Sequence, residues 1–585
     1  MSHKSALTRL APPGTWRGRI LQLLATEGAI LFREGVFPFL RIVSHRVTTY
    51  RTLRTAYARW LQHTTPRGDA LARQRAEAQT FPVRPLISLL TPVYNPAPDI
   101  LRTTLESVLA QTYERWELCL ADGASTRPGV RETLAEYAQK DPRIRLQTLP
   151  ANLGISGNSN AALRMAQGEY IQLLDHDDTL TPDALFEIVQ SLNQNPTTDL
   201  LYFDEDKLSE DGRIRRGPLF KPGWSPELLL SANFLSHCAI RRGLVLEAGG
   251  FDPGMDGAQD WDLAFRVTER TSHIAHLPKV LYNWRQVTGS TAIFADAKTG
   301  VFAAQIRAVQ SHLHRTGLEN AEGTVIPPGT LRFRWPVSGA KVSIILPFSH
   351  PPPPARTLSS LLQKTAYPDI ELIVNGEMPG ETPDPRVQFG NTPATLANAQ
   401  GTFLLFLHPD LLPLTPDWLE EMVRWAERPE IAVVGAKLIS PNRTIQHAGI
   451  VFAPHGQPHF VFQGMPETAR GAFGPVDWVR NYSAVSGDCL LIRREVFEQI
   501  GGFDAENLVD TMELCHRVSQ KNYRIVYTPF ARLKWSKAPR HTPASLQNKR
   551  KPLQTQSNSD PYFNPNLSPS LVPTFQRSDV ETFQH

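Results

Sequence analysis

The chain has 585 residues, of which 41% are hydrophobic and 20% charged, the composition of a globular protein with room for about two to four domains. Its four cysteines, Cys119, Cys238, Cys489 and Cys515, form no CxxC pair, which excludes a disulfide scaffold and a structural zinc site and indicates a reducing compartment. No stretch approaches the ~18–20 consecutive apolar residues of a membrane-spanning helix, and the start lacks the apolar core of a signal peptide, so a cytoplasmic location is predicted.

The first 80 residues are strongly basic, with 13 Lys and Arg against 4 Asp and Glu, whereas the whole chain has a net charge of +4. Arginines and apolar residues recur here at roughly helical spacing, which predicts a helical extension. This extension either packs on the next domain or lies on an anionic membrane through residues 1–60, peripherally at the inner face of the cytoplasmic membrane. No nucleic-acid partner is expected, because the positive charge is confined to this arm and no recognised binding motif follows it.

After Pro82, strand and helix patterns alternate. PLISLLTPVYNP predicts a buried strand and its loop, DILRTTLESVLAQTY a helix, WELCLADGAS a second strand, VRETLAEYAQKD a helix and RIRLQTL a third strand. This order predicts an α/β fold with an open, mainly parallel sheet and a ligand site at the carboxyl ends of its strands. Residues 92–95, Asp122 and residues 175–178 all fall at such ends.

The pattern begins again at Lys341. KVSIILPFSHPPPP restates the first strand and loop, TLSSLLQKTAYPDIELIV restates TLESVLAQTYERWELCL, and MELCHRV restates WDLAFRV, all in the same order. We infer a tandem duplication. The predicted organisation is a basic helical extension (1–80), a first α/β domain (81–318), a linker (319–338), a second α/β domain (339–537) and a disordered tail rich in Pro, Ser, Asn and Gln (538–585).

An acidic turn, Asp175-His176-Asp177-Asp178, closes one of the apolar strands. Asp-x-Asp at a strand end presents hard oxygen ligands at one point, which suits Mg²⁺ or Mn²⁺. Turns and helix caps also use Asp freely, but Thr181 and Pro182 can start the next helix without these acids. The metal site is therefore the favoured interpretation.

Two further segments each allow two interpretations. NLGISGNSNAAL, residues 152–163, is either a loop whose backbone amides approach a phosphate or sugar, or a plain loop with a helix cap. In GAQDWDLAFRV, Asp260 is free to point into a cleft as a general base, whereas Asp262 supports the start of the helix. The alternative is that both acids only cap the helix.

Eight motifs occur in order: PVYNP, LADGAST, NLGISGNSNAA, GEYIQLLDHDD, YFDEDK, GGFD, QDWDLAFRV and LYNWR. Together they closely resemble the family 2 glycosyltransferases with the GT-A fold, most of all the two-module members that build bacterial O-antigens, capsules and other surface polysaccharides. The resemblance covers residues 81–318 strongly and 339–537 more weakly. It implies two tandem GT-A domains, which are Rossmann-like folds of the nucleotide-diphospho-sugar transferases.

The resemblance also implies roles for individual residues. Asp260 matches the family's catalytic base. The DxD site, which binds Mn²⁺ or Mg²⁺ on the diphosphate of the sugar nucleotide, is matched by Asp175 and Asp177, and Asp178 is expected to assist. The residues expected to hold the nucleotide sugar are Pro92, Tyr94, Asn95, Asp122, Asn152, Gly154, Asn160 and Arg285. The residues expected at the acceptor are Asp204, Glu205 and Asp206, which otherwise form a solvated turn, and Trp261.

The chain departs from the family's pattern at two places. The family usually has Asp-Asp-Gly-Ser at the second strand end, where this chain has Asp122-Gly-Ala-Ser125, so one carboxylate is missing from the nucleotide site. Relatives often have His before the last Trp-Arg, where this chain has Asn283, so an imidazole contact is lost.

The predicted activity is inverting, metal-dependent transfer of a hexosyl or deoxyhexosyl group from a nucleotide-sugar donor to a hydroxyl of a glycan or lipid-linked glycan, in bacterial surface polysaccharide biosynthesis. One alternative is a non-catalytic glycan-binding or scaffold protein of a polysaccharide assembly complex. A metal-dependent nucleotidyltransferase has less support, because no Gly-rich triphosphate loop follows the first strand.

The second copy lacks most of the acids. Aligned on the repeat, Asp175 becomes His408, Asp178 becomes Leu411, Asp260 becomes Thr511 and Arg285 becomes Ser536, while Asp410 matches Asp177. Thr511 cannot act as a base, and Asp510 and Glu513 lie one or two places off its position. A degenerate module that binds glycan or supports the first is predicted; a bifunctional enzyme with both modules active is the alternative.

Overall fold

The computed structural model describes residues 36–287, 299–327, 329–346, 355–375, 384–390, 398–453, 456–503, 511–537 and 560–568. The chain forms two compact units. The first comprises the residues up to Trp224 and Asn233–Arg332, and the second comprises Ser225–Ala232 and Phe333–Leu571. The division falls inside the predicted linker 319–338, where β10 (Glu322–Ile326) pairs with β11 (Thr330–Arg334).

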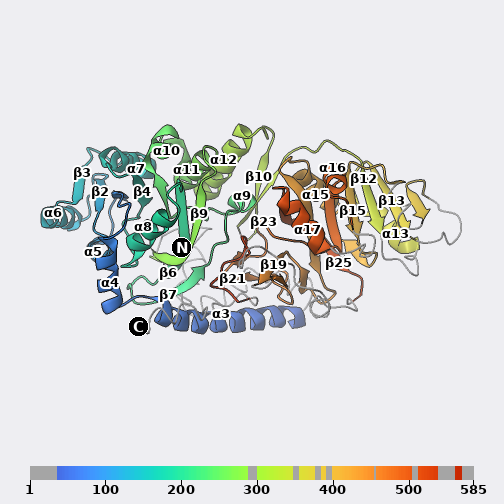
Figure 1. Ribbon diagram of the computed structural model, residues 1–585, viewed down its shortest axis with the longest axis horizontal. Coiled ribbons are helices and arrows are strands. Elements are labelled where there is room, and N and C mark those ends of the chain that lie inside the picture. Colours follow the sequence, from blue (N-terminus) through green and yellow to red (C-terminus); the bar gives the residue numbers. More distant parts are fainter. Residues whose placement is uncertain are drawn as a thin grey trace, which may run out of the picture. The chain divides into compact units, whose positions relative to one another are not determined.

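The first unit is built on a sheet with strand order β3-β2-β1-β4-β8-β6-β9-β5, with β7 pairing β6 (Figure 1). Its strands are β1 (Ile87–Val93), β2 (Trp116–Asp122), β3 (Ile144–Thr148), β4 (Tyr170–Leu173), β5 (Thr179–Leu180), β6 (Leu200–Leu208), β7 (Arg215–Leu219), β8 (Cys238–Arg241) and β9 (Ile274–Arg285). β1 to β4 are parallel, β8 is antiparallel to β4 and β6, and β9 is parallel to β6. The predicted α/β fold with a largely parallel sheet is confirmed.

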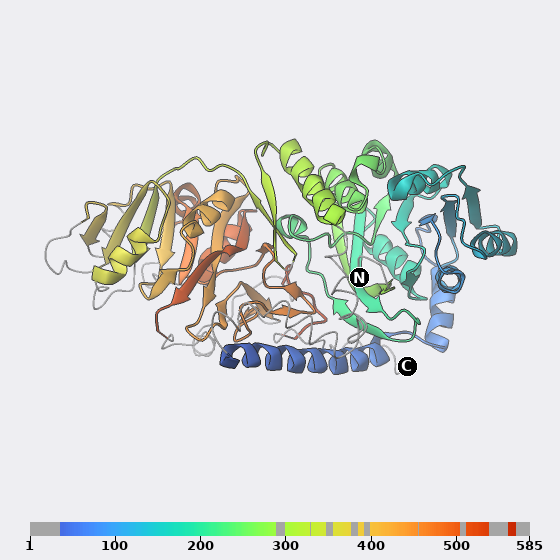
Figure 2. The same cartoon turned by 180° about the vertical axis from the view of Figure 1, so that it is seen from behind.

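Helices pack against this sheet (Figure 2). The helices of this unit are α5 (Pro98–Leu109), α6 (Val130–Lys140), α7 (Gly154–Met165), α8 (Ala184–Gln194), α10 (Arg242–Glu247), the short η1 (Pro253–Met255), α11 (Gln259–Thr268) and α12 (Thr299–Arg315). β1 is buried along its whole length, as expected for a strand covered on both faces. α5 buries Leu101, Leu105 and Val108 at helical spacing behind Pro98, which starts the helix.

The register of the parallel strands places the polar motifs at one edge of the sheet. Val93 at the end of β1 pairs with Asp122 at the end of β2, and Leu90 pairs with Leu173 at the end of β4. The residues that follow these strands therefore emerge at the carboxyl edge. This is the edge at which open α/β sheets bind ligands.

The second unit repeats this topology. Its sheet has the order β14-β13-β12-β15-β24-β17-β25-β16, which matches the order of the first sheet; β18 pairs β17 as β7 pairs β6, and β23 pairs β25 without a counterpart in the described part of the first sheet. The main strands are β12 (Val342–Leu346), β13 (Ile370–Asn375), β14 (Val387–Gly390), β15 (Phe403–Leu407), β16 (Leu411–Pro413), β17 (Ile431–Ile439), β24 (Cys489–Arg493) and β25 (Arg524–Trp535). The shorter strands are β18 (Ile445–His447), β19 (Ile450–Ala453), β20 (Gln457–Phe460), β21 (Arg470–Gly471), β22 (Gly474–Pro475) and β23 (Arg480–Asn481). The helices described in this unit are α9 (Pro226–Leu229), α13 (Ala355–Gln363), α15 (Trp418–Ala426), α16 (Arg494–Gln499) and α17 (Thr511–Gln520).

A buried polar clamp recurs in both units. Ser88 Oγ donates a hydrogen bond of 2.6 Å to Glu117 Oε1 and accepts one of 2.8 Å from Gly168 N. A Cβ atom on Gly168 would lie 2.5 Å from Leu86 O, so the close approach requires glycine. The same contacts join Ser343, Glu371 and Gly401 in the second unit. The duplication inferred from the sequence is therefore confirmed in the structure.

The described part of the basic extension is helical, with α3 (Val36–Thr64) and α4 (Asp69–Ala78); residues 1–35 lie outside the described ranges. Tyr57 and Trp60 of α3 are buried and meet the ring of Phe220 edge-on, and Tyr57 Oη donates a 2.6 Å hydrogen bond to Asp206 Oδ2. The carboxyl-terminal half of α3 is thus a packed extension of the first unit. Within the described ranges, no helix has both the length and the apolar character needed to cross a membrane.

The expectation of a disordered tail does not hold for residues 560–568. Asp560 Oδ2 accepts a 2.7 Å hydrogen bond from Phe452 N, and Asn564 and Leu567 are buried. A few buried side chains therefore anchor a segment whose polar composition suggested disorder. The rest of 538–585 lies outside the described residues, as do Asp510, residues 347–354 and most of the loop after β14.

Candidate active site

Three carboxylates meet in the turn that follows β4. Asp175, Asp177 and Asp178 each offer an oxygen within 4.8 Å of the others, and within the described ranges no other trio of His, Cys, Asp or Glu does so. Asp175 and Asp177 are half-buried, so a small cation can reach them from the sheet edge. Burial, with added repulsion from Asp177, raises the pKa of Asp175 to about 7. This donor set of crowded carboxylate oxygens fits a divalent cation such as Mn²⁺ or Mg²⁺.

Asp178 also fixes the shape of this turn. It is fully buried; its Oδ2 accepts a 2.7 Å hydrogen bond from Tyr282 Oη, and its Oδ1 accepts one of 2.7 Å from the backbone amide of Arg285. The Tyr282 hydroxyl in turn accepts a 3.2 Å hydrogen bond from Asp175 N. Burial and the two neighbouring acids raise the pKa of Asp178 well above its ordinary value. Asp178 thus ties the acidic turn to the end of β9.

Arg285 does not occupy the position expected for a diphosphate ligand. Its side chain is 2% exposed, and its guanidinium donates to Asp177 O at 2.7 Å, to Thr103 Oγ1 at 2.9 Å and to Glu210 O at 3.2 Å. All three nitrogens are therefore engaged by the protein. The structure corrects the sequence-based role: Arg285 supports the backbone of the acidic turn from behind.

Four of the residues predicted for the nucleotide sugar, Pro92, Tyr94, Asn95 and Asp122, lie at or directly after the ends of β1 and β2. Asn95 has a positive φ of 51°, and its Oδ1 accepts hydrogen bonds of 2.8 Å from both Thr126 N and Arg127 N, which shapes the loop after β2. Tyr94 is 44% exposed beside this loop. Pro92 is tied to the acidic turn, because its carbonyl oxygen lies 3.0 Å from His176 Nδ1.

Asp122 carries a buried acceptor that the described residues do not satisfy. Its Oδ1 accepts a 3.0 Å hydrogen bond from Ser125 N, whereas Oδ2 is buried without a hydrogen-bond partner in the described part of the chain, with Arg131 Nε 3.7 Å away. A buried oxygen in this state is costly unless a ligand supplies the donor. Asp122 is therefore suited to accept a hydrogen bond from a nucleotide.

The Asn- and Gly-rich loop makes contacts within the protein. Asn152 Oδ1 accepts hydrogen bonds from Gly154 N and Asn158 Nδ2, and the Asn160 amide bonds both backbone groups of Phe251. The amide of Ser156 at the start of α7 donates a 3.0 Å hydrogen bond to Asp256 Oδ1.

These contacts change two sequence-based expectations. Asp256 occupies the anion position at the start of α7, close to Gly154, that the sequence offered to a phosphate. The amide oxygen and nitrogen of Asn160 each hydrogen-bond to the backbone of Phe251. The loop instead anchors residues 251–256, which lead into α11.

Asp260 lies in the first turn of α11. It is half-buried, and its Oδ2 accepts a 2.8 Å hydrogen bond from Asn233 Nδ2. Burial raises the pKa of Asp260 to about 6, against the lowering effect of hydrogen bonds from two backbone amides and from Asn233. A carboxylate with this pKa is ionised near neutral pH and is a stronger base than an ordinary Asp.

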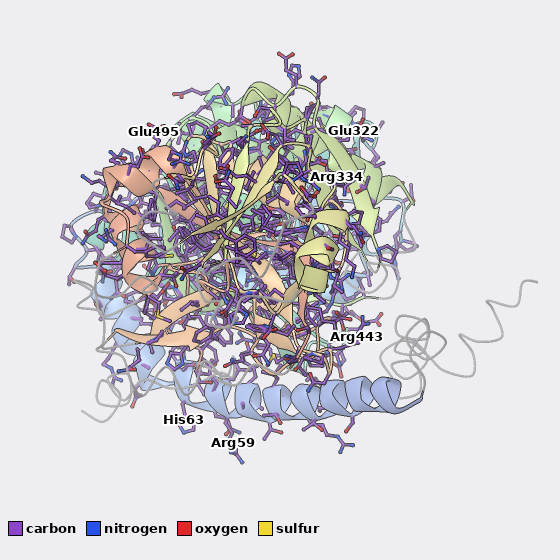
Figure 3. All side chains as sticks on the ribbon, turned by 90° about the vertical axis from the view of Figure 1, so that its right-hand side faces the viewer. Arg59, His63, Glu322, Arg334, Arg443 and Glu495 are labelled. Carbon is purple, nitrogen blue, oxygen red and sulfur yellow. The ribbon has the colours of Figure 1, made fainter. Side chains whose placement is uncertain are left out.

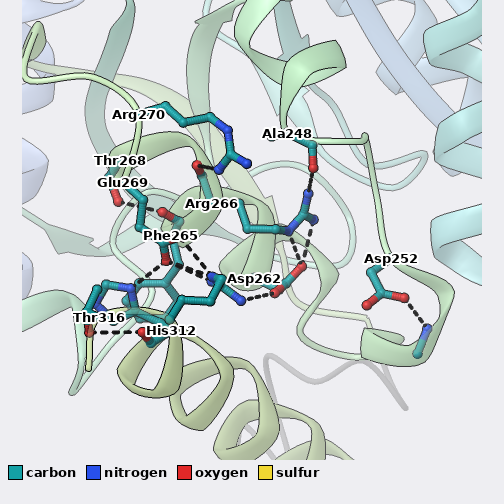
Figure 4. A network of polar contacts seen from close by, with 12 residues as sticks. Ala248, Asp252, Asp262, Phe265, Arg266, Thr268, Glu269, Arg270, His312 and Thr316 are labelled. Carbon is teal, nitrogen blue, oxygen red and sulfur yellow. Dashed lines mark hydrogen bonds and ion pairs between the residues drawn. The ribbon is translucent and has the colours of Figure 1, made fainter. Parts of the chain in front are cut away.

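The neighbours of Asp260 on α11 have structural contacts. Asp262 is buried and paired with Arg266, whose guanidinium also donates to Ala248 O (Figure 4). This fits its expected role in supporting the helix. Trp261 is 4% exposed and stacks on Phe265, so it does not present the acceptor contact expected from the sequence.

The acidic run 204–206 is buried, which corrects both the acceptor role and the solvated turn. Asp204 lies 2.9 Å from His276 Nε2, and Asp206 accepts hydrogen bonds from Tyr57, Arg215 and Asn283. Asn283 thus donates a 2.8 Å hydrogen bond to the buried carboxylate of Asp206. Glu205 lies 3.1 Å from Lys221 Nζ and 3.0 Å from His237 Nδ1.

Sequence reasoning did not single out Asn233, His237 and Tyr282. Asn233 and His237 lie in SANFLSHCAI, an apolar stretch without a motif, and Tyr282 reads as a core aromatic residue of β9. Their role comes from contacts with residues far along the chain. The signal that could have found these residues is that each contacts an acid far away in the sequence. A single sequence does not reveal such contacts.

The strand register gives the counterparts in the second unit. Tyr170 and Phe403 occupy equivalent places beside β1 and β12, so Asp175 corresponds to His408 and Asp178 to Leu411. In the first sheet, Leu208 at the end of β6 pairs with Arg285. In the second sheet, the pairing of the equivalent strand β17 ends at Lys534, the residue after Leu533, and so stops short of the counterpart of Arg285. α17 begins with Thr511 where α11 carries Asp260 in its first turn. The second unit keeps the fold without the acidic set.

Comparison with known proteins shows that residues 88–246 match the model of the family described as glycosyl transferase family 2. The chain is 39% identical over 530 residues to the protein y4gI of Sinorhizobium fredii (83% of this chain, 58% of the relative) and 39% identical over 475 residues to the O-antigen biosynthesis protein RfbC of Myxococcus xanthus (77% and 37%). It therefore spans less than two thirds of either relative. A solved structure of S. aureus TarS 1-349 in complex with UDP-GlcNAc matches 39% of this chain and 66% of its own, with 18% identity and a TM-score of 0.32.

Proposed function

Because residues 88–246 form a glycosyl transferase family 2 domain, we propose that the first unit transfers a sugar from a nucleotide-sugar donor to a hydroxyl of a glycan or lipid-linked glycan in surface polysaccharide biosynthesis. One observation carries this proposal: a cation-type cluster and Asp260 on α11 occur in the same unit, whereas the described part of its structural duplicate has no such cluster and has Thr511 at the start of the equivalent helix. The relative named for O-antigen biosynthesis supports the choice of pathway.

The acidic turn would hold the cation. Asp175 and Asp177 present free-standing carboxylates, while Asp178 contributes an oxygen from the position fixed by Tyr282. When bound, Mn²⁺ or Mg²⁺ offsets negative charge on the diphosphate. The unsatisfied Oδ2 of Asp122 and the exposed ring of Tyr94 would hold the nucleotide at the neighbouring strand ends.

Asp260 performs the proton transfer. Its carboxylate accepts the proton of the acceptor hydroxyl while that oxygen forms a bond to the anomeric carbon. The bond from this carbon to the diphosphate oxygen breaks at the same time, and the nucleoside diphosphate leaves with the electron pair. Attack from the face opposite the leaving group inverts the configuration. Asn233 holds Asp260 in place by donating to Oδ2.

The second unit binds glycan or supports the first in this proposal. Its strand-end positions carry His408 and Leu411 in place of acids, and Thr511 lies where the base would be. If the second unit were a transferase of altered chemistry, the protein would be bifunctional. If neither unit were active, it would be a glycan-binding scaffold.

A sugar-nucleotide screen tests the proposal. The purified chain would be incubated with Mn²⁺ and a panel of sugar nucleotides without acceptor, and release of nucleoside diphosphate would be measured. We expect slow hydrolysis of one donor that stops when EDTA removes the cation. Glycan binding without binding or hydrolysis of any sugar nucleotide would favour the scaffold and overturn the transferase.

We also propose that α3 rests on the anionic inner face of the cytoplasmic membrane. No acid occurs between Glu34 and Asp69, and Arg51, Arg54 and Arg59 are exposed. Figure 3 shows Arg59 and His63 on the outer side of this helix. Each arginine near such a surface contributes about 1 kcal/mol, so the attraction is sensitive to salt.

The measurement is sedimentation with vesicles of phosphatidylglycerol. Replacing the three arginines of α3 by Gln is expected to release the protein from the vesicles at low salt. A control removes three exposed charges elsewhere, at Arg270, Lys364 and Lys521. Equal binding to neutral phosphatidylcholine vesicles, or equal release by the control, would contradict the proposal.

A further inference from the structure

A buried cluster of three polar side chains, Glu205, His237 and Lys221, lies behind the acidic turn of the first unit. Glu205 on β6 is 4% exposed, and its Oε2 lies 3.0 Å from His237 Nδ1 and 3.1 Å from Lys221 Nζ. Because a carboxylate can only accept hydrogen bonds, His237 donates from Nδ1 and Lys221 balances the charge. Neither the proton transfer nor cation binding, as described above, uses these three side chains.

The ring of Tyr282 connects this cluster to the acidic turn. The imidazole of His237 stacks on Tyr282, with 3.6 Å between ring centroids and 19° between planes. Tyr282 Oη donates to Asp178 Oδ2 at 2.7 Å and accepts from Asp175 N at 3.2 Å. Glu205 thus orients His237, and His237 fixes the ring of Tyr282 by stacking on it. The hydroxyl of Tyr282 in turn hydrogen-bonds to Asp178 and Asp175, two residues of the cation cluster.

The second unit shows that the fold does not require this arrangement. Leu200 pairs with Ile240 in the first sheet as Val433 pairs with Ile492 in the second, and Glu205 pairs with Tyr282 as Leu438 pairs with Leu533. Counting along these strands gives three counterparts. Glu205 corresponds to Leu438, His237 to Cys489 and Tyr282 to Leu533, all of them fully buried.

The first unit keeps polar residues at three buried positions where the second unit has apolar ones, and this difference needs a reason other than stability. Replacing a buried ion pair by well-packed apolar residues is often neutral or stabilising. The unit with Leu, Cys and Leu at these places keeps the same strand order, and it also lacks the counterparts of Asp175, Asp178 and Asp260. The polar set and the acids are thus present together in one unit and replaced together in the other.

We propose that Glu205, His237 and Tyr282 are positioning residues that set the geometry of the cation site without touching donor or acceptor. This inference rests on the proposed function, because it assigns the acidic turn to a divalent cation. Tyr282 holds Asp178 and the backbone of Asp175 in the arrangement that a small cation requires. Loss of such outer partners weakens metal affinity by about 10–100-fold in other proteins.

Two substitutions test the inference, Tyr282→Phe and His237→Ala. The readouts are direct binding of Mn²⁺ by calorimetry, without sugar nucleotide, and the Mn²⁺ concentration that gives half-maximal activity. Both variants are expected to weaken Mn²⁺ binding by about tenfold or more, with the rate at saturating Mn²⁺ changed much less. His237→Phe keeps a ring against Tyr282 and is expected to recover part of the loss.

A second tyrosine provides the matched control. Tyr202 is buried in the same sheet, stacks on His276 at 4.8 Å and donates its hydroxyl hydrogen bond to Pro222 O and not to the acidic turn. Tyr202→Phe is expected to leave Mn²⁺ binding unchanged. If Tyr282→Phe lowers the melting temperature as Tyr202→Phe does while Mn²⁺ binding stays at the wild-type level, the role is only structural and the inference fails. A wild-type chain that binds no Mn²⁺ would overturn the proposed cation site as well.

Discussion

Asp260→Asn is expected to lower the rate of sugar transfer by about 10²–10⁴-fold while the affinity for the nucleotide sugar stays close to wild type. Asparagine has the same shape and can keep the contact with Asn233, but it cannot accept the proton of the acceptor hydroxyl. The measurement is the release of nucleoside diphosphate in the presence of acceptor, with donor affinity determined by calorimetry. Activity that survives this substitution in both transfer and hydrolysis would remove Asp260 as the base.

The control for this prediction is its neighbour on α11. Asp262→Asn breaks a buried pair with Arg266 and is expected to lower the melting temperature more than the rate of the folded protein. The pH profile gives a second readout. Because the pKa of Asp260 is raised to about 6, transfer should fall as the pH drops through 6 and the base becomes protonated. A rate that does not change between pH 5 and 8 would contradict the assignment.

Asp177→Asn is expected to reduce kcat/KM for the donor by about 10³-fold and to abolish measurable Mn²⁺ binding. Asp177 is half-buried and, unlike Asp178, does not have its carboxylate tied to Tyr282 or to the amide of Arg285. Its loss therefore removes a ligand with little effect on the turn. Donor turnover with Mn²⁺ and direct Mn²⁺ binding check this result.

The second unit supplies the matched variant. Asp410 corresponds to Asp177 and lies beside Ser536, with 3.4 Å between Ser536 Oγ and Asp410 Oδ1. Asp410→Asn is expected to change neither Mn²⁺ binding nor donor turnover. If it instead removes one of two products, the second unit is a transferase and the bifunctional alternative is correct.

The sequence by itself determined the class of fold, its duplication and the place of the acids. Buried strands read as apolar runs such as ISLLTPV, and helices read as repeats of three or four residues, because both patterns depend on near neighbours in the chain. A polar residue that directly follows a parallel strand must emerge at the carboxyl edge, so Asp122 and Asp175 could be placed from order alone. The departures in the second copy could be predicted in the same way.

Only the tertiary structure decided which polar side chains remain available to a ligand. Arg285, Asn160 and Asp206 have the chemistry to bind a donor or acceptor, yet each is engaged by protein groups. Tyr57 bonds Asp206 across 149 residues of sequence, a contact that no local pattern encodes. Burial and hydrogen-bond partners arise when distant segments pack, and a buried polar group must take the nearest partner that the packing supplies. For this reason several residues that were expected to contact a ligand instead stabilise the fold, while Asp260 and the acidic turn remain at the candidate site.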